Sequence, residues 1–145
     1  MQLSNEWVAS VMETDSGRVI ERCRLYLDTA RLSGKFGERV EMQWMLRGDS
    51  TGMPTDTEAE VIDQFMALAC DALERSQTAV LTAIYTGAKQ VRYMFYATQA
   101  QALTGCLQPL LNVSKSLPLR IGATEDPEWK EYIDIIARHA TCREE

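Results

Sequence analysis

The amino-acid sequence predicts an α+β fold built around one antiparallel sheet. Two runs of β-branched and aromatic residues, 78–85 and 91–97, flank a short turn and predict a β-hairpin. One stretch with helical periodicity precedes this hairpin and another follows it. A strand before the first helix and one after the second complete the order β, α, β, β, α, β. This is the ferredoxin-like, or split βαβ, arrangement, with both helices on one face of the sheet.

The N-terminal region, residues 1–37, predicts a β-hairpin in front of this core. Its strands are expected over 6–13 and 18–28, with a turn at 15–17. If the second of these strands paired with the first core strand, that core strand would lose one of the two neighbours that the regular order gives it. We therefore expect a modified ferredoxin-like order, in which the hairpin extends the sheet or folds over it.

The first half of the core shows the clearest local patterns. Residues 38–47 alternate between apolar and polar side chains and predict a half-buried strand. An irregular loop, 48–54, leads to a helix expected over 56–75. In that helix Thr55 and Glu58 match a capping box, and apolar residues recur at helical spacing.

The second half of the core begins with the central hairpin, where Gly87 provides the conformational freedom that a tight turn needs. A helix is expected over 99–113. A strand is expected over 117–123. Pro118 cannot donate a hydrogen bond within a sheet, so it belongs at the sheet edge or at the first turn of this strand. A C-terminal helix follows, with Asp126 as its N-cap and Pro127 at its first position, and we expect the polar tail after Arg138 to fray.

At 145 residues the chain is expected to form a single domain. It comprises the hairpin extension (1–37), the βαββαβ core (38–123) and the C-terminal helix with its tail (124–145). The four cysteines show no CxxC pair, which favours reduced thiols over a zinc site or a disulfide framework. The sequence begins without a basic and apolar leader, and no apolar run reaches membrane-spanning length. We therefore expect a soluble cytoplasmic protein without a cofactor.

The charge balance narrows the class of partner. The formal net charge is −6, with an isoelectric point near 4.9. Binding to DNA, RNA or anionic membranes depends on clustered Lys and Arg, so this composition argues against all three. An acidic surface instead suits a basic protein partner.

Arginines and aromatic residues are expected to line the sheet face that the two core helices leave open. Strand alternation places these side chains there: Arg22, Arg24, Arg39, Arg47, Arg92, Tyr26, Met94 and Tyr96. RNA-recognition motifs use such a face, but residues 89–96 lack the glycine and the aromatic spacing of that motif. Cross-strand ion pairs with Glu13, Glu21 and Glu41 are the preferred interpretation, and an anion or small-molecule site is the alternative.

The aromatic residues of the C-terminal helix have two interpretations. Trp129 and Tyr132 share a helix face with Ile133 and Ile136. This pattern favours a place in the hydrophobic core. A patch that contacts a partner protein is the alternative.

Catalytic and metal-binding motifs are few. The only histidine, His139, and Cys142 would supply two of the usual four metal ligands, so no metal site is expected. No nucleophile, phosphate-loop or dinucleotide-binding motif is present, although a mechanism based on carboxylates, Lys89 or Lys115 stays open. The loop 48–54 could offer backbone amides to an anion, but a connecting loop is the preferred interpretation.

Four segments together are similar to a bacterial family known as domain of unknown function 695. The segments are NEWVAS, ERVEMQWMLRGDSTGMPTDTEAEVIDQFMALACDALE, RYMFYA and EDPEWKEYIDII. The last contains the D-x-x-W-x-x-Y stretch of that family, here Asp126, Trp129 and Tyr132. The resemblance implies no activity and no catalytic residues. Such domains are sometimes joined to a region that looks like the regulator of ribonuclease E activity B, which implies an inhibitor or adaptor role.

Three functional hypotheses follow. The leading one is a non-enzymatic, cytoplasmic bacterial module that binds another protein, such as a basic enzyme that it regulates, or that binds a second copy of itself. The second is a small-molecule or anion binder that uses the Arg-bearing sheet face, with Arg22, Arg24, Arg39, Arg92 and Tyr96 as its candidate residues. The third is an enzyme that depends on carboxylates or lysine.

Overall fold

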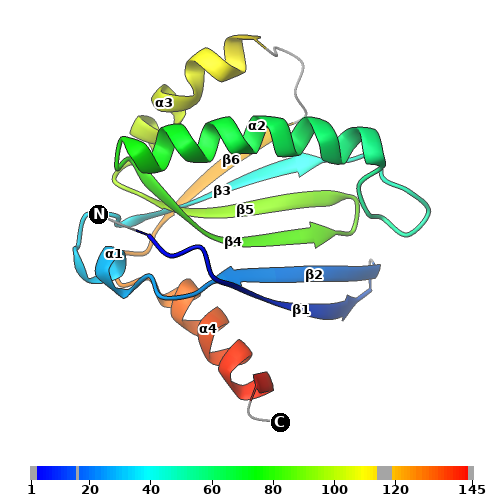
Figure 1. Cartoon of the computed structure of the whole chain (residues 1–145), viewed down its shortest axis with the longest axis horizontal. Coiled ribbons are helices and arrows are strands. Elements are labelled where there is room, and N and C mark those ends of the chain that lie inside the picture. Colours follow the sequence, from blue (N-terminus) through cyan, green and yellow to red (C-terminus); the bar gives the residue numbers. More distant parts are fainter. Residues whose placement is uncertain (1–2, 16, 114–118, 144–145) are drawn as a thin grey trace.

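The computed structural model describes residues 3–15, 17–113 and 119–143 and contains one sheet with helices on both faces (Figure 1). The strands are β1 (Trp7–Thr14), β2 (Gly17–Arg24), β3 (Glu38–Met45), β4 (Ala79–Gly87), β5 (Gln90–Ala97) and β6 (Leu119–Glu125). The helices are α1 (Asp28–Leu32), α2 (Asp56–Arg75), α3 (Ala100–Val113) and α4 (Lys130–Arg143). The fold is therefore α+β, as predicted. The predicted turn residue Ser16, Lys115 and Pro118 lie outside the described residues.

The six strands form an antiparallel sheet in the order β1-β2-β4-β5-β3-β6. The N-terminal hairpin extends the sheet, because β2 pairs with β4, for example Cys23 with Ala83. β3 keeps two neighbours, β5 and β6, so the expected competition for it does not arise. The outer strands of the sheet are β1 and β6.

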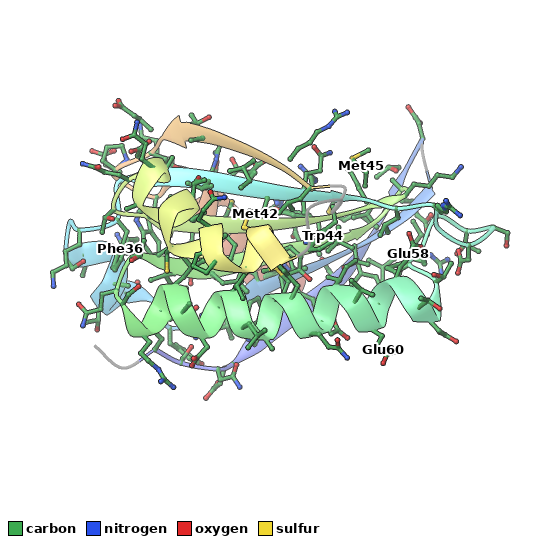
Figure 2. The ribbon with its side chains drawn as sticks, turned by 90° about the horizontal axis from the view of Figure 1, so that it is seen from above. Phe36, Met42, Trp44, Met45, Glu58 and Glu60 are labelled. Carbon is green, nitrogen blue, oxygen red and sulfur yellow. The ribbon has the colours of Figure 1, made fainter. Side chains whose placement is uncertain are left out.

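The two faces of the sheet are covered by different helices. α2 and α3 share a core with Met42 and Trp44 of β3 and Phe95 of β5, and Figure 2 shows Met42 and Trp44 on the side of β3 that faces α2. The second core joins α4 to Met94 and Tyr96 of β5. The expectation of helices on one face therefore holds for α2 and α3, whereas α4 covers part of the opposite face (Figure 1). The neighbouring residues of β5 alternate between the two cores, as strand geometry requires.

Two predicted element boundaries are wrong for local reasons. The second strand was expected to continue to residue 28 but ends at Arg24, and Tyr26 adopts a left-handed conformation with φ of 61°. The C-terminal helix begins at Lys130, since Trp129 has φ of 58° and its N–H donates to the carbonyl of Asp126. A left-handed residue cannot continue a strand or a right-handed helix, so each element stops there.

Candidate functional site

Arg22 and Arg24 of β2 lie on the sheet face that α2 covers. Arg24 bonds to Glu74 of α2, and Arg22, two residues earlier, shares that side. Glu21 and Cys23 point the other way, toward α4. The prediction that these arginines share the open face with those of β3 and β5 is therefore wrong. Alternation shows which residues lie on the same side of one strand. The pairing of that strand with its neighbours decides to which face of the sheet this side belongs.

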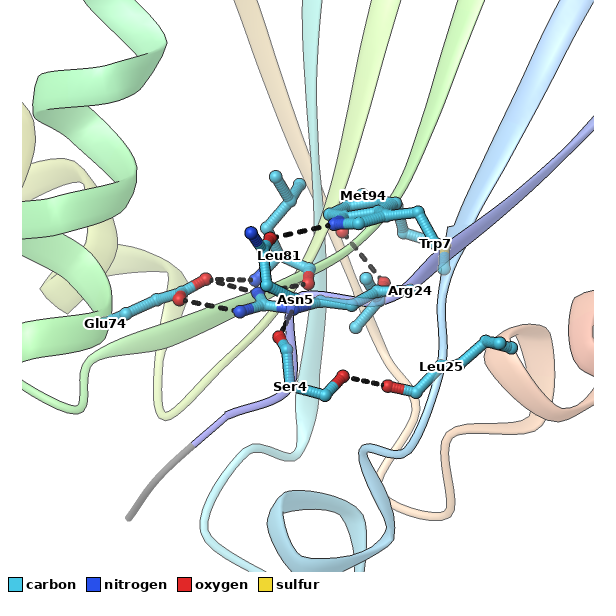
Figure 3. Close-up of polar contacts among 9 residues, drawn as sticks. Ser4, Asn5, Trp7, Arg24, Leu25, Glu74, Leu81 and Met94 are labelled. Atoms are coloured by element: carbon cyan, nitrogen blue, oxygen red, sulfur yellow. Dashed lines mark hydrogen bonds and ion pairs between the residues drawn. The ribbon is translucent and has the colours of Figure 1, made fainter.

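Arg24 is fully committed to contacts within the chain (Figure 3). It is 7% exposed. Its two terminal nitrogens donate to Glu74 at 2.8 and 3.2 Å, its Nε donates to the carbonyl of Ser4 at 2.7 Å, and Nη1 also reaches the carbonyl of Leu81 at 3.1 Å. The guanidinium thereby joins the N-terminal segment, β2, α2 and β4.

Arg39 and Arg92 lie on the α4 side of the sheet. Arg39 pairs with Glu131 of α4 at 3.6 Å, and the guanidinium of Arg92 lies 4.6 Å from the ring centre of Tyr85. The Nε atoms of both arginines are buried and have no hydrogen-bond acceptor among the described residues.

The preferred interpretation of these arginines as ion-pair partners of Glu13, Glu21 and Glu41 is wrong for Glu13 and Glu21. Glu13 pairs with Arg18 at 3.1 Å across the first hairpin. Glu21 pairs with Arg138 of α4 at 2.8 Å. Helices therefore provide several of the ion-pair partners that were expected from neighbouring strands.

Tyr96, Trp129 and Tyr132 are brought together in the core beneath α4. The rings of Tyr96 and Trp129 stack with centres 4.3 Å apart, and Trp129 meets Tyr132 edge to face at 5.5 Å. All three residues are buried, at 0%, 1% and 4% exposure. They occupy the core position that was preferred for the C-terminal aromatic residues, and Tyr96 is covered where an RNA base would have to stack.

Asp126 connects these aromatic residues to the start of α4. Its carboxylate accepts hydrogen bonds from the Tyr96 hydroxyl at 2.8 Å and from the backbone N–H groups of Lys130 and Glu131 at 2.9 and 3.1 Å. Burial opposes ionisation, but these donors and the charge of Arg39 together hold the pKa of Asp126 below its usual value. Asp126 therefore caps α4 as a buried carboxylate.

A second buried polar cluster lies at the other end of α4. His139 is 5% exposed, and its Nε2 lies 3.0 Å from Oε1 of Glu21, although the two atoms are not aligned as a hydrogen bond. Arg138 contacts the other oxygen of Glu21, and Tyr85 interacts with the same carboxylate. The expected frayed tail is wrong for His139, whose spacing from Tyr132 along the helix could have indicated burial.

This cluster is not a metal centre. No group of three or more His, Cys, Asp or Glu side chains in the described part of the chain could hold an ion. The side chain of Cys142, the proposed second ligand, lies outside the described residues.

Several backbone amides in and beside the loop 48–54 are occupied by the chain's own carboxylates. Asp49 accepts hydrogen bonds from the N–H groups of Thr51 and Met53 and from the Thr51 hydroxyl, and the bonds from Thr51 hold the pKa of Asp49 below its usual value. Glu58 accepts from the N–H groups of Arg47 and Gly48, at 2.8 and 3.0 Å. These amides therefore have no free position for an external anion.

A broad groove lies between this loop and the two hairpin turns at the same end of the sheet. Its lining residues are Glu13, Asp15, Gly17, Arg18, Ile20, Ser50, Thr51, Gly52, Met53, Ala88 and Lys89. Lys89 is exposed, and Glu13 and Arg18 are 70% and 68% exposed at their side chains. Solvated charges of this kind lack the burial that would adapt them to acid–base catalysis.

The solvent-facing side of α2 is acidic. Asp56, Glu60 and Asp63 are exposed and have no ion-pair partner among the described residues. The only basic residue of α2, Arg75, lies in its last turn and pairs with Asp71 at 3.2 Å. The N-terminal two turns therefore present negative charge that forms no ion pair within the described part of the chain.

An apolar pocket of about 160 Å³ adjoins this part of α2. Its lining residues are Trp44, Met45, Leu46, Thr57, Glu58, Val61 and Ile62. Figure 2 shows Trp44 of β3 on the α2 side, with Glu58 near the loop end of the helix and Glu60 on its outer side. The indole of Trp44 is 2% exposed, and its N–H has no acceptor among the described residues. Sequence periodicity placed Trp44 in the core but gave no sign of this pocket.

Comparisons with known proteins identify one family. No helix in the described part of the chain is long and apolar enough to cross a membrane. Neither a curated protein nor a solved structure matches the chain. The model of the family of unknown function DUF695 matches residues 5–136, a span that includes the sheet, the acidic helix α2 and the Asp126 cap. The chain therefore belongs to the DUF695 family.

Proposed function

We propose that this protein is a non-enzymatic binding module that recognises a basic surface on another protein, such as an enzyme that it regulates. The observation that supports this proposal is the exposed negative charge of Asp56, Glu60 and Asp63 on one side of α2, which forms no ion pair with any described residue. Charges grouped on one rigid element steer an oppositely charged partner and increase its association rate. The net charge of −6 acts in the same direction.

The two alternative functions have less support. An anion site would need free guanidinium groups gathered on one face of the sheet. Arg22 and Arg24 lie on the α2 side, whereas Arg39 and Arg92 lie on the α4 side. Arg24 is also bound to Glu74 and to two carbonyls. A lysine-dependent enzyme would need a desolvated amine, but Lys89 is exposed. A binding surface requires neither feature.

We also infer a ferredoxin-like arrangement for residues 38–123 and a bacterial cytoplasmic location. The order β4-β5-β3-β6, with α2 and α3 on one face, supports the first inference. The free thiols of the buried Cys23 and the half-buried Cys70 support the cytoplasmic location, since desolvation raises the pKa of each to about 12.

The test is capture of partners by charge-matched variants. The tagged wild type, the double variant Glu60→Lys/Asp63→Lys and the control Glu128→Lys/Asp134→Lys are used to recover proteins from nuclease-treated lysate of the source organism. The two variants change the net charge equally, but the control alters exposed residues at and just before α4. We expect a basic protein to be recovered near stoichiometrically with the wild type and the control, and at least about tenfold less with the α2 variant. Equal recovery with all three proteins, or none with any, would contradict the proposal.

A further inference from the structure

We infer that the apolar pocket between β3 and α2 is the site that receives one apolar side chain from the basic partner. This inference rests on the proposed function. It identifies the contact that would make recognition of the partner specific, in addition to the attraction between opposite charges. The pocket and the acidic side of α2 share the first two turns of one helix, since Thr57, Glu58 and Val61 line the pocket and Glu60 lies on the outer side. A single peptide segment could therefore contact both.

The pocket is already formed in the free chain. Trp44 makes an edge-to-face contact with Phe65 of α2, with ring centres 5.4 Å apart, which fixes the indole between sheet and helix. Val61 and Met45 are 46% and 39% exposed although both line the pocket. Covering these side chains would remove apolar surface from water, which favours binding. A preformed pocket also avoids an ordering cost on binding.

The lining defines the chemistry of the occupant. Apolar walls and a volume of about 160 Å³ suit one aliphatic or aromatic side chain.

The charge beside the pocket favours a basic neighbour in the ligand. Partial burial of Glu58 opposes ionisation, but the N–H groups of Thr55, Arg47 and Gly48 hold the pKa of its carboxyl below the usual value. Glu58 therefore stays negative at neutral pH, and the exposed charge of Glu60 lies two residues later on the outer side of the same helix. An apolar residue flanked by Lys or Arg fits this combination, whereas an acidic ligand does not.

The first test uses small analogues of single side chains, so that no partner has to be known. Indole and p-cresol are titrated into the labelled protein, with benzoate as an acidic control that the charge beside the pocket should exclude, and NMR spectra report each group. We expect indole or p-cresol to shift the Trp44 indole N–H and the methyl groups of Met45, Val61 and Ile62. Shifts spread evenly over the surface, or none at these groups, would overturn the inference.

Two matched substitutions on α2 make the test specific. Val61→Glu adds a charge at the rim of the pocket, and Leu68→Glu adds the same charge two turns later, where the side chain is 60% exposed and does not line the pocket. We expect Val61→Glu to weaken binding of the analogue at least about tenfold and Leu68→Glu to change it less than about twofold. Equal effects of the two substitutions would overturn the inference.

The same variant separates this inference from the proposed function. If the partner is lost with Glu60→Lys/Asp63→Lys but retained fully with Val61→Glu, the pocket inference fails and the binding function stands. If Glu60→Lys/Asp63→Lys retains the partner, the proposed function fails, whether or not indole and p-cresol bind in the NMR titration.

Discussion

Gly87 lies where the end of β4 passes close to the backbone of β2. A Cβ atom added to Gly87 would lie 2.3 Å from the carbonyl oxygen of Arg18 and 3.0 Å from the Cα of Val19, and the φ angle of 141° already disfavours a side chain. The tight turn itself is made by Ala88 and Lys89, whose φ angles are 55° and 62°. Glycine is thus required for the approach of two strands as well as for the path of the chain.

Substitution of Gly87 should therefore be far more costly than substitution of another strand glycine. We expect Gly87→Ala to lower the free energy of unfolding by about 2 to 4 kcal/mol, because backbone atoms cannot move aside easily. Gly122→Ala in β6 is the control, since an added Cβ would meet no atom within 4 Å, and its effect should stay below about 0.5 kcal/mol. Urea denaturation measures both changes, and similar values for the two variants would contradict the prediction.

Helix α4 is attached to the sheet at both ends by buried carboxylates. Asp126 caps its first turn, and Glu21 contacts Arg138 and His139 near its other end. Between them Tyr132 donates its hydroxyl to the carbonyl of Arg24 at 2.7 Å. The position of α4 therefore depends on polar contacts as well as on apolar burial.

The capping carboxylate predicts a pH dependence. The folded-state pKa of Asp126 lies below the ordinary value of 3.8, so its ionised form contributes stability above that pH and the contribution is lost as the pH falls through the folded-state pKa. We expect Asp126→Asn to lower the free energy of unfolding by about 1 to 3 kcal/mol at neutral pH. This difference from the wild type should shrink as the pH falls below about 4 and through the folded-state pKa.

Denaturation with guanidinium chloride at a series of pH values measures this difference. Asp134→Asn, on the exposed side of α4, provides the control and should have little effect at any pH. A difference between wild type and Asp126→Asn that stays constant with pH would show that the charge of Asp126 does not stabilise the helix.

At the scale of the whole molecule, Arg24 and Glu74 connect parts that are distant in the sequence. The pair links β2 to the last turn of α2, and Arg24 also binds the carbonyls of Ser4 and Leu81. The side chains of Arg24 and Glu74 are 8% and 21% exposed. Removing one partner of a partly desolvated, bidentate ion pair is costly, because the remaining charge is left without its partner.

A double-mutant cycle tests this connection. We expect Arg24→Met to lower the free energy of unfolding by about 3 to 5 kcal/mol, and the double variant Arg24→Met/Glu74→Gln to cost at least about 1 kcal/mol less than the sum of its single variants. The exposed pair of Arg75 and Asp71 at the same end of α2 is the control, with an expected coupling below about 0.5 kcal/mol. Equal coupling in the two cycles would contradict a special role for Arg24.

The elements that depend on nearby residues were predictable from the sequence. The alternation of residues 38–47 correctly predicted β3, and Thr55 and Glu58 form the predicted capping box of α2. Both signals lie within a few residues of the structure that they specify, so no knowledge of distant partners is needed. The family resemblance was likewise contained in local segments and was confirmed.

The sites, in contrast, were decided by tertiary structure. Alternation placed Arg22 and Arg24 on one side of their strand, but only the pairing of β2 with β4 put that side beneath α2. The buried His139 depends on the docking of α4 against Glu21, and the pocket beside Trp44 depends on the spacing between β3 and α2. By itself the sequence determined which segments are strands and helices. It also determined which side chains lie on the same side of each strand or helix. The tertiary structure decided which face those side chains meet, because contacts between distant segments have no periodic signal within either segment.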